Sequence, residues 1–276
     1  MKLGIAMTLP HISPEQWAEK HKNAGLSAVV FPCNHKAETA EIDAYVKASK
    51  DYDLTIAEVG AWSNPMDLDP EARSRNFDYC RHQLELAEYV GACCCVNIAG
   101  AKGPVWDGGY PDNYTEETYW EIVDCVQRLI DSVKPQKTCY TLEPMPWMHP
   151  DSPEDYLQMV RDIQRDAFGV HLDMVNMISS PQKYLFNQKF TNDAIAMLGP
   201  DIKSCHIKDM VLESSLTVSL KEVPCGEGGF DLKNYMDQLD KLDSDLPVII
   251  EHLNQEEAYY QAIRYLQGLR EDKKNG

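Results

Sequence analysis

The sequence predicts an α/β protein folded as a single (β/α)8 barrel, a TIM barrel, over residues 1–276. Eight short apolar runs each precede an amphipathic segment, and strands that alternate with helices form a parallel sheet. The length of 276 residues suits such a barrel, which typically has about 250 residues. An open dinucleotide-binding sheet is disfavoured, because the glycine-rich segment 224–230, "PCGEGGF", comes late in the chain and lacks GxGxxG spacing.

The predicted strands are short, apolar segments of the kind found in parallel sheets that are covered by helices. In chain order they are residues 3–7, 26–32, 54–62, 93–100, 138–144, 168–173, 202–209 and 246–253.

The segments between these strands carry helix signals. The clearest is 13–25, where Ser13 is expected as the N-cap, Pro14 at the first helical position, Gln16 closing a capping box and Gly25 past the end. A long loop is expected after the seventh strand. The other helices are expected near 38–52, near 70–90, along the stripe from Tyr119 to Val133, after Ser152, near 181–198, within 230–242, and around Ala262, Leu266 and Leu269.

Composition and charge narrow the classes of partner. The formal net charge of −18 repels phosphate backbones, so no nucleic-acid partner is expected. The first ten residues hold only a short apolar run, and no run reaches the roughly 18 apolar residues of a membrane span. We therefore expect a soluble, cytoplasmic protein without a membrane partner. The nine cysteines form no CxxC pair, which favours reduced thiols.

Four consecutive predicted strands end on residues that bind metals. Glu143 ends the fifth, Asp173 the sixth, His206 lies near the end of the seventh, and Glu251 near the end of the eighth. Active sites of (β/α)8 barrels lie at these carboxyl ends. Alone, a strand-end glutamate is usually solvated or caps a helix, and a lone strand histidine is usually a core residue. Four on neighbouring strands favour a shared site.

The chemistry of these side chains predicts a cation. Buried carboxylates cost several kcal/mol each unless they are paired or bound to a cation. Three carboxylates and one imidazole form a mainly oxygen set, which suits Mn²⁺, Mg²⁺ or Co²⁺ better than a thiolate zinc site. We expect one divalent metal ion per chain, with Mn²⁺ as the first choice. Because side chains alternate along a strand, Thr141, His171 and Ser204 should point inward with the ligands, and Cys205 outward.

"TLEP" (141–144), "HLDMVN" (171–176), "SCHIKD" (204–209) and "IIEHL" (249–253), with the later "VPCGEGGFD" (223–231), resemble the xylose isomerase-like TIM barrel family of sugar phosphate isomerases and epimerases. The likeness covers essentially the whole chain. It implies a metal held by Glu143, Asp173, His206 and Glu251. In the ketose 3-epimerase branch the two glutamates are also the acid/base pair.

The resemblance implies a mechanism. One glutamate would remove the proton next to the carbonyl of an open-chain ketose, giving a metal-stabilised cis-enediolate, and the other would return a proton from the opposite face. Epimerases of this type often carry a histidine where this chain has Asn176, and the sugar-gripping arginine of that branch has no clear counterpart here. Asn176 and Lys208, the nearest basic residue, are the expected substrate contacts.

Further substrate contacts are expected from residues just beyond the strands. Trp62, Asn97, Trp147 and His149 follow strands three, four and five. Glu227 lies in the glycine-rich segment, which we interpret as a substrate-covering loop. Only Lys221 supplies positive charge near that loop, so no phosphorylated substrate is predicted. Glu58 is a weaker candidate that is expected to cap a helix or face solvent.

Three alternatives to a sugar isomerase or epimerase stay open. A metal-dependent lyase that cleaves 3-keto-glycosides by elimination would begin with the same proton abstraction. An endonuclease IV-like barrel would need three zinc ions held by several more histidines, and a basic DNA-binding face. This chain has only eight histidines in total and a charge of −18. A non-catalytic sugar-binding barrel would not need two glutamates across a metal. In each sugar-related case the partner is a small carbohydrate, and assembly into a homo-oligomer stays open.

Overall fold

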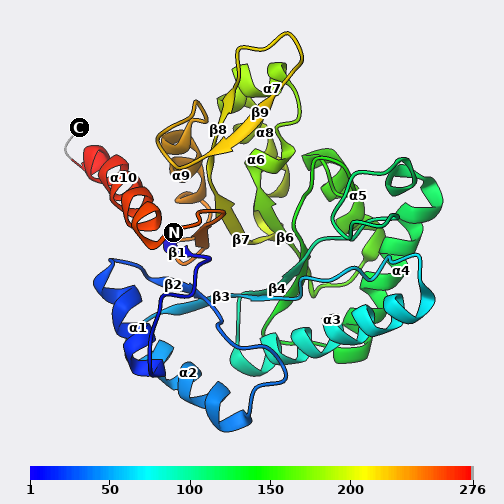
Figure 1. Ribbon diagram of the computed structural model, residues 1–276, viewed down its shortest axis with the longest axis horizontal. Helices are drawn as coiled ribbons and strands as arrows, with labels where there is room; N and C mark the ends of the chain where they lie inside the picture. Colours follow the sequence, from blue (N-terminus) through cyan, green and yellow to red (C-terminus); the bar gives the residue numbers. More distant parts are fainter. Residues whose placement is uncertain (275–276) are drawn as a thin grey trace.

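Eight parallel strands form the centre of the computed structural model, which describes residues 1–274, and helices surround them (Figure 1). Hydrogen bonds join the strands in the order β1-β10-β7-β6-β5-β4-β3-β2. The ring is nearly closed between β1 and β2, where the N–H of Ser27, just before β2, donates to the carbonyl of Leu3 at 2.9 Å. The predicted (β/α)8 barrel is therefore confirmed. The barrel strands are β1 (Lys2–Ile5), β2 (Ala28–Val30), β3 (Thr55–Gly60), β4 (Cys94–Asn97), β5 (Cys139–Leu142), β6 (Phe168–Asp173), β7 (Ile202–Ile207) and β10 (Pro247–Ile250).

Helices follow the strands in the predicted order. Within residues 1–274 no helix is long and apolar enough to span a bilayer. The α-helices are α1 (Pro14–Asn23), α2 (Thr39–Asp51), α3 (Pro70–Val90), α4 (Glu116–Val133), α5 (Pro153–Ile163), α6 (Met174–Met177), α7 (Pro181–Leu185), α8 (Asn187–Leu198), α9 (Leu232–Leu239) and α10 (Glu256–Lys274), and short 3-10 turns occur at Pro111–Tyr114 and Gly199–Asp201.

The two ends of α1 show the hydrogen bonds and backbone conformation behind the predicted helix signals. The hydroxyl of Ser13 accepts the N–H of Gln16 at 3.2 Å, as an N-cap does. The side chain of Gln16 accepts the N–H of Ile12 at 2.8 Å instead of that of Ser13, so the predicted capping box closes one residue earlier. Gly25, with φ of 76°, takes the left-handed conformation that glycine favours after a helix.

The helical region predicted near 181–198 is two helices, with a break at Phe186. The break coincides with side-chain hydrogen bonds of Asn187 to the backbone. Its amide donates to the carbonyls of Tyr184 (2.7 Å) and Gly229 (3.0 Å), and its oxygen accepts the N–H of Asp231 at 2.9 Å. These bonds fasten the start of α8 to the segment before α9.

The long loop expected after the seventh strand contains an antiparallel hairpin, β8 (Asp209–Leu212) and β9 (Leu220–Val223), which projects at the top of Figure 1. The carboxylate of Asp209 is buried at its base. It accepts N–H groups of Gly226, Gly228 and Phe230, each at 3.0 Å. A Cβ on Gly228 would lie 2.3 Å from this carboxylate, so the glycine-rich turn fits closely over Asp209.

Packing divides into two regions. The main apolar core lies between the sheet and the helices, and it includes Cys205, which points outward as predicted. A small cluster of Ala28, Ala57 and Ile249 fills part of the barrel interior. All nine cysteines are free, in agreement with the expected reduced thiols. Buried polar side chains occupy further positions in the barrel interior.

We predict that Asp209→Ala lowers the free energy of unfolding by about 3 kcal/mol, because buried N–H groups of the glycine-rich turn lose a charged acceptor. Urea unfolding followed by circular dichroism measures this loss. The control is Asp166→Ala at an exposed position, which should change stability by no more than about 0.5 kcal/mol. Equal stability of the two variants would contradict the structural role of Asp209.

Candidate metal centre

The four predicted metal ligands meet at the carboxyl end of the barrel. Glu143 follows β5, Asp173 ends β6, His206 lies on β7 and Glu251 follows β10. All four are buried, and each offers one ligand atom, the four atoms lying within 4.8 Å of one another. Parallel strands bring their carboxyl ends to one face of a barrel, which is why residues so distant in sequence converge.

The imidazole of His206 lies at the centre of this cluster. Its Nδ1 lies 2.8 Å from Oε2 of Glu251, 3.3 Å from Oε1 of Glu143 and 3.9 Å from Oδ2 of Asp173. Three carboxylates therefore converge on one ring nitrogen.

Lys208 supplies a second positive charge to the same cluster. Its ammonium lies 2.8 Å from Oδ2 of Asp173 and 3.5 Å from Oε2 of Glu222, and it donates a short hydrogen bond to Glu251. Lys208 is 2 % exposed. Its side chain is thus directed into the carboxylate cluster and does not line the cavity, whereas Lys208 was expected to contact the substrate.

The cluster shifts the pKa values of its members. Burial lowers the pKa of an imidazole, but the carboxylates of Glu251 and Glu143 outweigh it and hold the pKa of His206 well above its usual range. Burial raises the pKa of Asp173 to about 7, although Lys208 opposes this. Burial also opposes ionisation of Glu251, yet His206 and Lys208 hold its pKa well below its usual range.

The residues present fit a divalent metal ion. Oδ2 of Asp173 is buried, and the ammonium of Lys208 lies 2.8 Å from it, which leaves lone pairs of this carboxylate available to a cation. The donor set of three carboxylates and one imidazole is the one expected for Mn²⁺, Mg²⁺ or Co²⁺. Among the described residues, the cluster of Glu143, Asp173, His206 and Glu251 is able to hold a metal ion.

A cavity of ≈ 370 Å³ opens above the cluster. Glu143 and Glu251 reach its floor, and aromatic, apolar and acidic side chains form its walls. The lining residues are Trp62, Ile98, Trp106, Asp107, Glu143, Met145, Pro146, Trp147, Asn176, Glu222, Glu251 and His252.

Three of the six predicted substrate contacts line this cavity: Trp62, Trp147 and Asn176. Asn176 also donates to Oε1 of Glu143 at 3.0 Å, which fixes that carboxylate beside the cavity. The indole N–H of Trp147 donates to the carbonyl of Asp107 at 2.6 Å, which fixes one aromatic wall.

Two other predicted contacts, His149 and Glu227, do not line the cavity. The ring of His149 packs between Tyr114 and Tyr119, and its Nδ1 lies 2.7 Å from Asp155. Glu227 is exposed in the glycine-rich turn.

Asn97, another residue expected at the mouth, is fully buried. It exchanges hydrogen bonds of 3.1 Å with the backbone of Ser63, so it fastens the loop after β3.

Sequence reasoning missed the pair of Glu222 and His252. Glu222 lies on β9, and its Oε2 lies 2.9 Å from Nδ1 of His252. His252 directly follows Glu251 and has a φ of 58°, an uncommon conformation for histidine. The position of His252 directly after the strand-end Glu251 could have indicated that it lies at the mouth. Glu222 reaches the mouth only because of the hairpin, which was not expected.

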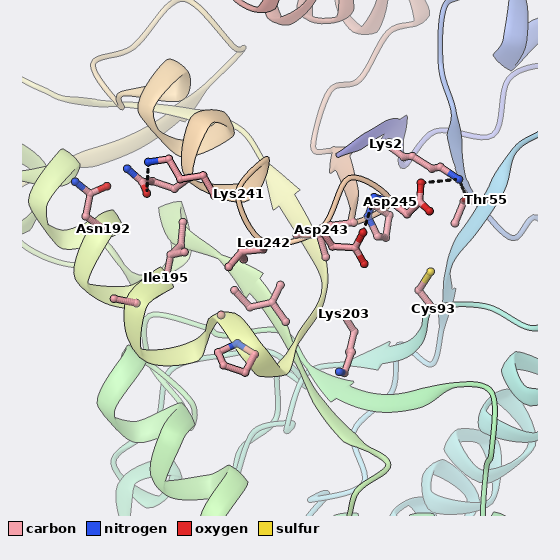
Figure 2. A pocket seen from close by; sticks show the side chains of 17 residues that line it. Lys2, Thr55, Cys93, Asn192, Ile195, Lys203, Lys241, Leu242, Asp243 and Asp245 are labelled. Carbon is pink, nitrogen blue, oxygen red and sulfur yellow. Dashed lines mark hydrogen bonds and ion pairs between the residues drawn. The ribbon is translucent and has the colours of Figure 1, made fainter.

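A larger hollow of ≈ 920 Å³ lies at the opposite end of the barrel (Figure 2). Lys2, Thr55 and Lys203, at the amino ends of their strands, help to line it. The ammonium of Lys2 donates to Thr55 at 2.8 Å and lies 3.4 Å from Asp245. Active sites of this fold lie at the other end, and the described residues that line this hollow include no group of carboxylates and imidazoles like the cluster at the mouth.

Fold and site together define a (β/α)8 barrel with a buried cluster at its mouth that is able to hold a metal. The model of the xylose isomerase-like TIM barrel family matches residues 18–269, and the chain belongs to this family. A search of curated protein sequences finds no match.

Solved structures of similar fold include several sugar epimerases. The 3-keto-D-glucoside 4-epimerase YcjR from E. coli has a TM-score of 0.72 and 16% identity, covering 97% of this chain and 99% of that chain. D-psicose 3-epimerase from Clostridium cellulolyticum, solved with D-tagatose, has a TM-score of 0.70 and 12% identity, covering 98% of each chain. A xylose isomerase-like TIM barrel protein from Mycobacterium smegmatis, in complex with magnesium, has a TM-score of 0.67 and 14% identity, covering 92% of this chain and 87% of that chain.

We predict that the apparent affinity for Mn²⁺ rises between pH 6 and pH 8. Metal ligands must be deprotonated, and the raised pKa values of Asp173 and His206 mean that both hold protons to higher pH than usual. Each proton released steepens the rise by up to about tenfold per pH unit. Calorimetric titrations in buffers of different ionisation enthalpy count these protons, and an affinity that does not change with pH would contradict the assignment.

Proposed function

We propose that this protein is a divalent-metal-dependent isomerase or epimerase that acts on an unphosphorylated ketose or keto-sugar. The reaction begins with removal of the proton next to the substrate carbonyl. Glu143, Asp173, His206 and Glu251 hold the metal, with Mn²⁺ as the first expectation and Mg²⁺ or Co²⁺ as alternatives. The family membership and the sugar epimerases of similar fold support this proposal.

One observation carries the assignment of roles. Of the four cluster residues, Glu143 and Glu251 line the cavity, whereas Asp173 and His206 do not. The two carboxylates that reach the substrate space are thus the two suited to proton transfer, and the other two residues are suited to metal binding alone.

The acid/base steps follow from this placement. When bound by these four residues, a divalent cation would supply Lewis acidity that polarises the substrate carbonyl and acidifies the adjacent C–H. One glutamate, ionised, takes the proton and becomes a carboxylic acid, leaving a cis-enediolate. The other glutamate delivers to the opposite face a proton that it takes from solvent during the turnover, and the first glutamate releases its proton to solvent, so both carboxylates end the turnover ionised. Asn176 holds Glu143 in place through its amide.

The walls of the cavity favour an uncharged sugar. Apart from the cluster glutamates, its ionisable lining consists of Asp107, Glu222 and His252, and no lysine or arginine among the described residues lines it. The nearest ammonium, that of Lys208, is engaged by carboxylates. A phosphate would meet acidic side chains without a basic partner. Trp62 and Trp147 offer flat apolar faces of the kind that line small-molecule sites.

A lyase is the second candidate. One of the solved structures of similar fold is a 3-keto-D-glucoside 4-epimerase, and its name indicates a keto-glycoside substrate. With such a substrate, the carbanion formed beside the ketone can expel the glycosidic oxygen at the next carbon instead of being reprotonated. The cavity of ≈ 370 Å³ lies within the size range of small-molecule sites, so it does not separate the two reactions.

We predict that the Mn²⁺-loaded protein in D2O incorporates deuterium at the carbon beside the carbonyl of ketoses or 3-keto-glucosides, as followed by NMR. In Glu143→Gln and Glu251→Gln the exchange rate should fall about 10²- to 10⁴-fold, because an amide cannot accept the proton. The control is Glu227→Gln, an exposed residue outside the cavity, which should exchange at the wild-type rate.

The products separate the candidate reactions. Exchange with formation of an epimer or isomer supports the first proposal, and release of the aglycone supports the lyase. Sugar binding without exchange, with unchanged binding in the two Gln variants, would contradict both and favour a non-catalytic barrel.

A further inference from the structure

Beneath the metal cluster lies a second polar layer that the proposed chemistry does not use. It consists of Glu58 on β3, His171 on β6 and Ser204 on β7, all pointing into the barrel and 2 % exposed or less. A carboxylate in a barrel interior is costly unless it has partners. The groups that contact the Glu58 carboxylate therefore indicate the role of this residue.

A bulge in β3 aims Glu58 inward. Val29 of β2 lies opposite Ile56, but the next residue, Val30, lies opposite Glu58, which leaves Ala57 as an extra residue. Ala57 already points into the barrel, and strict alternation would turn Glu58 outward. The extra residue resets the alternation and re-aims the following side chain.

Glu58 contacts the nitrogen of His206 that faces away from the metal cluster. Its Oε2 lies 3.4 Å from Nε2 of His206, whereas Nδ1 faces Glu143, Asp173 and Glu251. The other oxygen of Glu58 accepts a short hydrogen bond from the hydroxyl of Ser204. The two ring nitrogens of His206 therefore face two separate sets of carboxylates.

His171 fixes the plane of the same ring. Its imidazole packs edge-on against that of His206, with centroids 4.1 Å apart and an interplanar angle of 79°. Both of its ring nitrogens are buried without a hydrogen-bond partner, and Nδ1 lies 3.7 Å from Glu58. The His206 ring is thus packed against His171 and faces Glu58 along its Nε2 edge.

We propose that Glu58 is a positioning residue for metal binding: it accepts the Nε2–H of His206 and so leaves the Nδ1 lone pair free for the cation. A neutral imidazole has one donor and one acceptor nitrogen, and the partner of the donor decides which nitrogen binds a metal. This role rests on the proposed metal centre. It adds a fifth strand, β3, to the strands that build the site.

The test compares Mn²⁺ affinity, by calorimetry, in wild type, Glu58→Leu and Glu58→Asp. Glu58→Leu removes the acceptor, and Glu58→Asp keeps the charge but is shorter by one methylene, about 1.5 Å, so it cannot reach Nε2. Both variants should bind Mn²⁺ about 10- to 100-fold more weakly. The control is Thr141→Val, another barrel-interior change, whose hydroxyl contacts the carbonyl of Cys95 and not His206. Urea unfolding of each metal-free variant shows that it is folded.

A second readout is independent of affinity. In the Mg²⁺-loaded wild type, long-range ¹H–¹⁵N NMR should place the His206 proton on Nε2. A proton on Nδ1 would overturn the proposal.

The calorimetric outcomes are distinct. Wild-type affinity in both variants would overturn the positioning role, and so would weak binding in Glu58→Leu alone, because charge would then suffice. Two Mn²⁺ ions per wild-type chain and one in Glu58→Leu would make Glu58 a ligand of its own site. No binding by the wild type would overturn the metal centre itself, whatever Glu58 does.

Discussion

Three carboxylates held together out of water repel one another, and the arrangement at the mouth of this barrel follows from that repulsion. Glu143, Asp173 and Glu251 converge on Nδ1 of His206, and Lys208 contributes an ammonium from the same strand end. Two cations for three carboxylates leave one negative charge uncompensated, and burial, together with the neighbouring carboxylates, raises the pKa of Asp173 to about 7. A divalent cation that replaces the proton on His206 would, together with Lys208, balance the three carboxylates, which is the physical reason to expect a metal here.

The rest of the fold supports that cluster from three sides. Beneath it, the bulge at Ala57 turns Glu58 toward His206. Above it, the tryptophan-lined cavity limits the substrate to a small, uncharged molecule in our proposal. At the side, Asp209 fastens the glycine-rich turn beneath the hairpin that carries Glu222 to the mouth. Together these three features place side chains from distant segments of the chain around one point.

Much of the fold and the centre of the site could be predicted from sequence, because both follow from simple periodic rules. Strands that alternate with helices imply a parallel barrel, and parallel strands present their ends at one face. The convergence of Glu143, Asp173, His206 and Glu251 required only those two rules. The inward position of Glu58 was not predicted, because a single extra residue in β3 reverses the alternation of side chains. No sequence signal marks such a bulge. Loop residues were the least predictable: Trp147 reaches the cavity, whereas His149, two residues later, turns into a cluster of tyrosines.

The central claim is that a divalent cation holds the carboxylate cluster together, and the metal content of the purified protein tests it most directly. Mass spectrometry of wild type beside Glu251→Gln, both after exposure to Mn²⁺, Mg²⁺ and Co²⁺ and removal of excess metal, should find about one ion per wild-type chain and markedly less in the variant. No bound metal in the wild type, even after reconstitution, would contradict the account. Three zinc ions per chain would point instead to the nuclease branch of the fold.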